Sequence, residues 1–121
     1  MLPPIFEICS ASTAVTDLIG TDPVRLFPFG EAPASVERPY VVWQTISGSP
    51  ENYLGTLPDA DSYSVQVDVY GVDGADVLAV AQAIRDAVEP VAYVTSWGIT
   101  DRDFDTGLYR YNFTVDFMVN R

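Results

Sequence analysis

One strand and the helix that follows it, between Ser62 and Pro90, constrain the fold of this chain most strongly. Residues 62–70 alternate strictly between two kinds of side chain. One predicted face holds Tyr63, Val65, Val67 and Val69, and the other holds Ser64, Gln66, Asp68 and Tyr70. A period of two in β-branched and aromatic residues is typical of a half-buried strand. Such a strand needs an apolar partner on one face only.

The stretch after Gly71 supplies that partner. Asp73 is placed to cap a helix, and Pro90 is placed to end it. Between them, apolar residues recur at helical spacing and form one stripe: Val77, Val80, Ala81, Ile84 and Val88. We therefore expect this helix to lie across the apolar face of the strand, as the cover of a single sheet.

The remaining elements are shorter. Residues 4–19 are expected to form one kinked helix or two short ones, and further strands are expected at 24–29, 40–47, 91–96 and 108–119. Pro28 favours an edge position for the first strand. The last strand would invite pairing with another chain if it lay at a sheet edge. The predicted fold is a single α+β domain over residues 1–121. Its sheet has four to five strands, mostly antiparallel or mixed, with an N-terminal and a central helix packed on one face.

Residues 48–61 form the longest irregular stretch, between the second and third predicted strands. Irregular segments of this length are uncommon inside compact domains and usually serve a function. We interpret this one as a long hairpin arm, with Tyr53, Leu54 and Leu57 available to dock on another surface. The alternative is an ordinary surface loop.

Composition excludes several classes of function. Six basic and seventeen acidic residues give a net charge of −11, which repels nucleic acid and anionic membranes. The sequence contains no histidine, which removes most general-base, triad and transition-metal schemes. The single cysteine, Cys9, rules out an intrachain disulfide and is expected to be buried filler. No signal peptide and no apolar stretch of membrane-spanning length is evident. We expect no enzymatic activity and no cofactor.

A weak metal candidate is the stretch containing Asp101, Asp103 and Asp105. It resembles the first half of an EF-hand loop. Thr106 then stands where that loop has its glycine, and Asn112 where it has its bidentate glutamate. A solvated turn is the alternative interpretation. Two further aspartates, Asp59 and Asp61, could form a second acidic site.

The order of these elements resembles a known family. The strings that carry the likeness are Thr13-Ala-Val-Thr-Asp-Leu-Ile-Gly20, Val24-Arg-Leu-Phe-Pro28, Arg38-Pro-Tyr-Val-Val-Trp43 and Tyr63-Ser-Val-Gln-Val-Asp-Val-Tyr70, followed by the amphipathic helix. The chain is similar, over nearly its whole length, to the tail terminator proteins (tail completion, head-to-tail joining) of long-tailed double-stranded DNA phages. The likeness rests on element order and short hydrophobic strings, and transfers no catalytic residue.

This resemblance implies a structural virion protein, assembled in the bacterial host cytoplasm and placed at the head-proximal end of the tail. Six copies would form a ring that caps the tail tube, ends its polymerisation and binds the head connector or stopper protein. DNA would pass through without specific binding, and no membrane would be involved. We name as interface or lumen candidates Tyr53, Leu54, Leu57, Asp59, Asp61, Asp101, Asp103 and Asp105. The alternatives are a small acidic binding module for a cation or a basic protein, and an enzyme that uses carboxylates alone.

Overall fold

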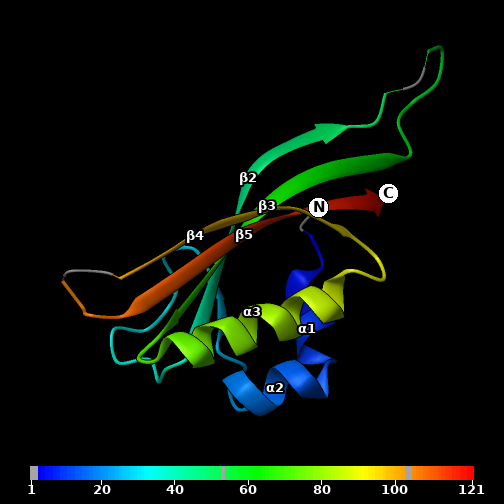
Figure 1. Ribbon diagram of the computed structural model, residues 1–121. Helices are drawn as coiled ribbons and strands as arrows, with labels where there is room; N and C mark the ends of the chain where they lie inside the picture. Colours follow the sequence, from blue (N-terminus) through cyan, green and yellow to red (C-terminus); the bar gives the residue numbers. More distant parts are fainter. Residues whose placement is uncertain (1–2, 53, 103–104) are drawn as a thin grey trace.

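A computed structural model describes residues 3–52, 54–102 and 105–121 of the chain. Its helices are α1 (Ile5–Ser10), α2 (Thr13–Ile19) and α3 (Gly74–Val88). Its strands are β1 (Leu26–Pro28), β2 (Tyr40–Pro50), β3 (Ala60–Gly71), β4 (Tyr93–Arg102) and β5 (Tyr109–Asn120). They form one five-stranded sheet in the order β1-β2-β3-β5-β4, antiparallel except for the parallel β1–β2 pair (Figure 1). The predicted α+β fold with a mixed sheet is confirmed.

The helices form a layer on one face of the sheet (Figure 1). α3 contacts β3, β4 and β5, and both α1 and α2 pack against α3. The apolar stripe of α3 is buried as predicted, together with Phe113 and Val115 of β5. On the apolar face of β3, the three valines are buried and Tyr63 is partly buried. The core of the protein is therefore the contact between α3 and the two central strands.

Local capping follows the sequence closely. Asp73 Oδ1 accepts the Ala75 N–H at 2.8 Å and begins α3. Ser12 Oγ accepts the Val15 N–H at 3.3 Å, so the N-terminal helical region is divided into two short helices. Cys9 is buried, and burial raises the pKa of its thiol to about 12. The thiol is thus protonated filler, because a thiolate is the nucleophilic form.

Two predicted strand ends need correction. β2 continues to Pro50, three residues beyond the predicted end at Ser47. β4 continues to Arg102, so Asp101 lies on a strand and not in a turn. The last strand, β5, lies between β3 and β4 from Tyr109 to Asp116, and its remaining residues pair with β3 alone within the described chain. In each case long-range pairing with a neighbouring strand outweighs the local preference of Gly, Pro and Asp for turns.

The two hairpins of the sheet end at opposite ends of the molecule (Figure 1). The β2–β3 connection, residues 51–59, projects beyond the helical layer as the predicted arm. The β4–β5 connection lies at the other end, beside Gly71 and Tyr109. The C-terminus lies at the arm end, where the Arg121 N–H donates to the Asp59 carbonyl at 2.9 Å. The same rigid sheet therefore carries both tips.

Replacing Val67 with aspartate tests this core. Val67 is 0 % exposed on β3, so Val67→Asp buries a carboxylate with no partner and should destabilise the fold by more than about 3 kcal/mol. Val91→Asp is the matched control, because Val91 is 63 % exposed. Thermal melting of soluble protein measures both. A Val67→Asp chain that melts cooperatively at the temperature of the unsubstituted chain would show that the wrong face has been placed inside.

Candidate assembly surface

The arm presents apolar side chains to water. Leu54 is 105 % exposed and Leu57 is 88 % exposed, at the tip of the β2–β3 connection. Tyr53, the third predicted arm residue, lies outside the described residues. Single exposed leucines are common, but two on a projecting tip form an apolar surface that another protein can cover.

The predicted aspartates do not come together. Asp59 is exposed at the arm, whereas Asp101 and Asp105 lie at the opposite end of the sheet. Asp103 lies outside the described residues. The strand β3 between the two ends spans about 40 Å at the usual rise per residue. A single acidic site that combines the two groups is therefore impossible within one subunit.

Asp61 and Asp101 form salt bridges with arginines. Asp61 is buried on β3, and its Oδ1 lies 2.9 Å from Arg121 Nη2. Asp101 Oδ2 lies 2.8 Å from Arg110 Nη2. Hydrogen bonds to Asp101 raise the pKa of Arg110, and hydrogen bonds to Asp61 raise that of Arg121. Each arginine offsets the charge of its carboxylate, so these two aspartates contribute less to the negative field around the protein than two unpaired carboxylates would. Within the described residues, no group of three or more histidine, cysteine, aspartate or glutamate side chains is placed to hold a metal ion.

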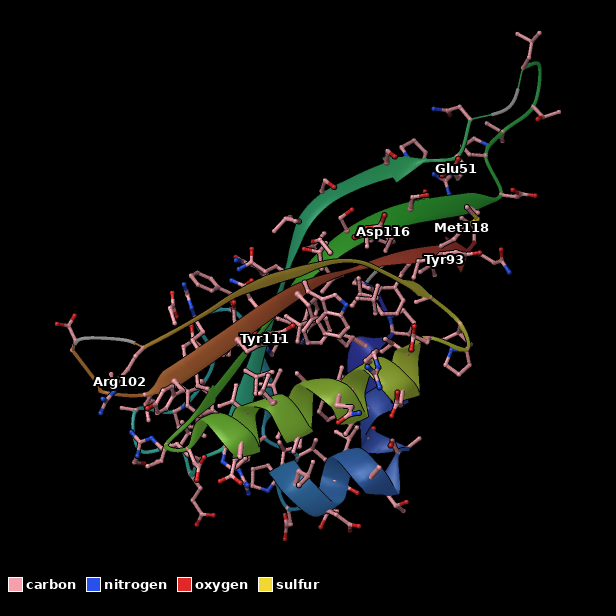
Figure 2. All side chains as sticks on the ribbon, viewed as in Figure 1. Glu51, Tyr93, Arg102, Tyr111, Asp116 and Met118 are labelled. Carbon is pink, nitrogen blue, oxygen red and sulfur yellow. The ribbon has the colours of Figure 1, made fainter. Side chains whose placement is uncertain are left out.

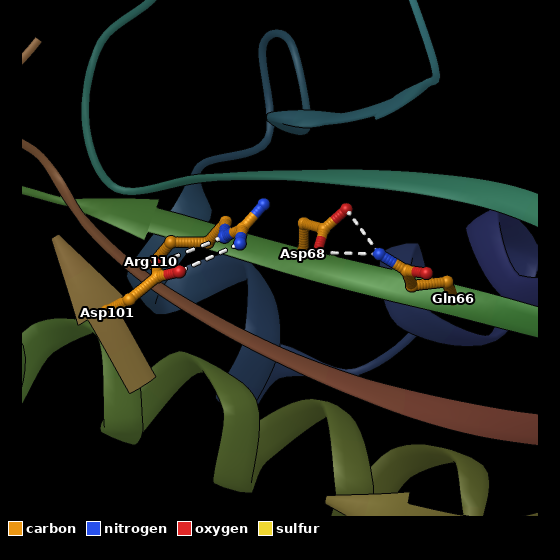
Figure 3. Close-up of polar contacts among 4 residues, drawn as sticks. All are labelled: Gln66, Asp68, Asp101 and Arg110. Carbon is orange, nitrogen blue, oxygen red and sulfur yellow. Dashed lines mark hydrogen bonds and ion pairs between the residues drawn. The ribbon is translucent and has the colours of Figure 1, made fainter. Parts of the chain in front are cut away.

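A polar cluster lies on the face of the sheet that carries no helix (Figure 3). Asp68 is only 5 % exposed, and Gln66 Nε2 donates to its two carboxylate oxygens at 3.2 and 3.3 Å. Burial raises the pKa of Asp68, while the hydrogen bond from Gln66 and the charge of Arg110 oppose that rise. The strict alternation of residues 62–70 placed Asp68 and Gln66 on this face, but the sequence held no sign that Asp68 is buried.

A shallow groove occupies the same face nearer the arm. Its volume is about 340 Å³, and its floor is lined mainly by Ser47, Ser49, Ser62, Ser64 and Asp116. Ser64 Oγ donates to Asp116 Oδ1 at 2.7 Å. Tyr93 and Met118, which are 78 % and 64 % exposed, lie beside it (Figure 2). Sequence reasoning missed this groove, because the pairing of three distant strands creates it.

Exposed apolar side chains on a projecting arm, and a second sheet face without a helix, indicate a protein that assembles with others. Comparison with known families supports this class. The sequence matches the family described as "Tail completion protein gp17" over residues 3–120. The chain belongs to this family, as its resemblance to tail terminator proteins implied.

Solved structures share the fold. A chain of the "Virion of native gene transfer agent (GTA) particle" is 13 % identical, with a TM-score of 0.74, and the match covers 97 % of this chain and 92 % of that one. "Structure of bacteriophage SPP1 gp17 protein" is 14 % identical, with a TM-score of 0.59, and covers 97 % and 86 % of the two chains. No curated protein matches the chain.

Family membership gives the protein a structural role in a phage tail, in company with other virion proteins. This role is consistent with a non-enzymatic protein. In the part of the chain that the structure describes, no helix is long and apolar enough to span a membrane.

The buried carboxyl of Asp68 predicts a pH-dependent stability. Because its pKa is raised in the fold, the ionised form costs stability once the pH exceeds that raised value. Asp68→Asn should therefore raise the melting temperature at pH 7. The gain should shrink as the pH falls through the raised pKa and vanish below the ordinary value of 3.8.

Melting curves between pH 3 and pH 8 measure this gain. The exposed helix residue Asp17, changed to asparagine, is the control. A loss of stability at neutral pH in Asp68→Asn would mean that the charge of Asp68 is stabilising, through Arg110.

Proposed function

We propose that the chain caps the tail tube as a six-membered ring, ends tube polymerisation and joins the tail to the head connector. The observation that carries the proposal is the match to the tail completion family along residues 3–120. Under this proposal the protein sits at the head-proximal end of the tail and is assembled in the host cytoplasm. Its partners are copies of itself, the tail tube protein and the connector or stopper protein.

The arm supports this function because it extends past the subunit that carries it. Pairing of β2 with β3 ends at Pro50 and Asp61, and the Glu51 N–H still donates to the Ala60 carbonyl at 2.9 Å. Beyond this point the arm holds Leu54 and Leu57, whose exposure leaves them available to a neighbour. A partner that covers both leucines would gain about 25 cal/mol for each Å² removed from water.

Shortening the arm tests this role. Replacing residues 52–58 with an Asn-Gly turn keeps the strand pairing and should leave the melting temperature nearly unchanged, because loop closure depends weakly on loop length. The yield of complete, infectious particles should fall by about tenfold or more, the effect of losing about 1.4 kcal/mol or more of binding.

Leu54→Ala with Leu57→Ala keeps the arm at full length and is the matched variant. It should reproduce much of the loss if the leucines form the contact. Normal joining of heads and tails by the shortened chain would show that the arm is only a linker.

The acidic candidates remain a proposal about the wall of the channel. Asp59, Asp61, Asp101, Asp103 and Asp105 would repel passing DNA within about one Debye length, ~8 Å at physiological salt. Asp61 and Asp101 are poor sites for a test, because lysine there would face Arg121 or Arg110. Asp59 and Asp105 are exposed, one near each tip, so the test uses these two.

We expect Asp59→Lys with Asp105→Lys to keep the fold and to slow DNA release, more strongly at low salt. Asp17→Lys, on the exposed side of α2, changes the net charge without approaching either tip and is the control. Release kinetics from purified particles are the measurement. Unchanged release at both low and high salt would contradict a channel position for these two residues.

A further inference from the structure

The half of the sheet next to the arm has two open strand edges. β4 begins at Tyr93, opposite Asp116, so residues 117–120 of β5 pair with β3 on one side and, within the described chain, with no strand on the other. β1 ends at Pro28, opposite Trp43. From Gln44 to Pro50, β2 is therefore unpaired on its outer side, as far as the described residues show. An unpaired edge is a template for another strand.

The backbone groups that point outward on β5 can be assigned. The Arg121 N–H donates to the Asp59 carbonyl, toward β3. Because N–H and C=O groups alternate in direction along an antiparallel strand, Met118 and Asn120 direct theirs to the open side. The bond from Thr95 Oγ1 to the Thr114 carbonyl, 3.5 Å, agrees with this assignment, since Thr114 then also faces the β4 side.

The same argument applies to β2. The Glu51 N–H donates to the Ala60 carbonyl, so Ser47 and Ser49 face β3, and Gly48 and Pro50 face outward. Pro50 thus faces outward without an N–H, so this edge offers one donor, the Gly48 N–H, and two acceptors, the Gly48 and Pro50 carbonyls. A register shift between Thr45 and Ser47 confines the regular outer edge to residues 47–50. This edge and the open edge of β5 are equally short.

The two edges lie on opposite sides of β3, and both strands are antiparallel to it, so β2 and β5 run in the same direction. In a closed ring, a rotation about the ring axis relates the copies, so a given strand makes the same angle with the axis in every copy. The β5 edge of one copy therefore meets the β2 edge of the next in parallel. We propose that residues 117–120 of one copy pair with residues 47–50 of the next. The halves of the sheets next to the arms would then form one continuous sheet around the ring. This inference rests on the proposed ring.

Side chains beside the two edges add to this contact. Met118 is 64 % exposed and Ile46 is 52 % exposed, and pairing would cover both. The ladder itself is weak, because each net hydrogen bond contributes only about 1 kcal/mol and parallel pairs are slightly less stable than antiparallel ones. Closure of the ring and contact with the tube would add to it. A twofold pairing of β5 with β5 would instead stop at a dimer and leave β2 open.

Engineered cysteines test the pairing directly. Ser47, Ser49 and Met118 lie on one face of the sheet, and Cys9 is buried, so it gives no background. Met118→Cys combined with Ser47→Cys or with Ser49→Cys should yield, on oxidation of particles and of concentrated protein, a ladder of covalent multimers on a non-reducing gel. Each single-cysteine variant should remain monomeric. Dimers from Met118→Cys alone, or no ladder from either double variant, would overturn the proposal.

Proline at Met118 separates backbone pairing from side-chain packing. The Met118 N–H faces outward, so Met118→Pro should keep the fold, as measured by its melting curve, and should be tolerated as edge prolines are. Met118→Pro is combined with Ser49→Cys and Asn120→Cys. It should lower the cross-linked fraction by about tenfold, which corresponds to a loss of about 1.4 kcal/mol of binding between copies. Met118→Ala, which keeps the N–H, should lower it far less.

Electron microscopy of particles separates the two proposals. Rings that assemble normally with Met118→Pro would overturn the edge pairing and leave the capping function intact. If the unsubstituted chain forms no ring on the tail at all, the proposed function itself fails. Should Met118→Pro fail to fold, the multimer ladder of the cysteine pairs decides alone.

Discussion

The structure depends on the burial of one helix stripe against the apolar face of two central strands. α3 is fifteen residues long, about 22 Å at the helical rise, whereas the twelve residues of β3 extend about 40 Å. One helix of this length cannot cover strands of that length. The half of the sheet next to the arm therefore extends beyond the α3 cover. Its edges are open because β1 ends opposite Trp43 and β4 begins opposite Asp116.

The sequence predicted what depends on local periodicity. The alternation of residues 62–70 and the stripe from Val77 to Val88 gave the core and its two partners correctly, because solvent and core impose those periods directly. Asp73 was readable as a cap because a short polar side chain directly precedes the helical stripe. The family likeness followed from the order of these elements.

What depends on strand pairing could not be predicted in this way. Asp101 was expected in a turn, yet it lies on β4 beside Arg110, because a partner far along the chain decides whether an aspartate joins a strand. The final strand became internal up to Asp116, where β4 pairs with it. Likewise, the burial of Asp68 and the salt bridge between Asp61 and Arg121 join residues whose proximity exists only once β3 and β5 are paired.

The placement of the hairpin tips at opposite ends of one sheet has a mechanical consequence. β3 and β5 pair without interruption from Gly71 and Tyr109 to Ala60 and Asn120, and this ladder connects the two ends. A pulling force applied at the tips acts along the strands, so it shears all of these hydrogen bonds at once and does not open them one after another. A subunit loaded in this direction is stiff. Tension or pressure received at one end of the molecule would reach the other with little loss.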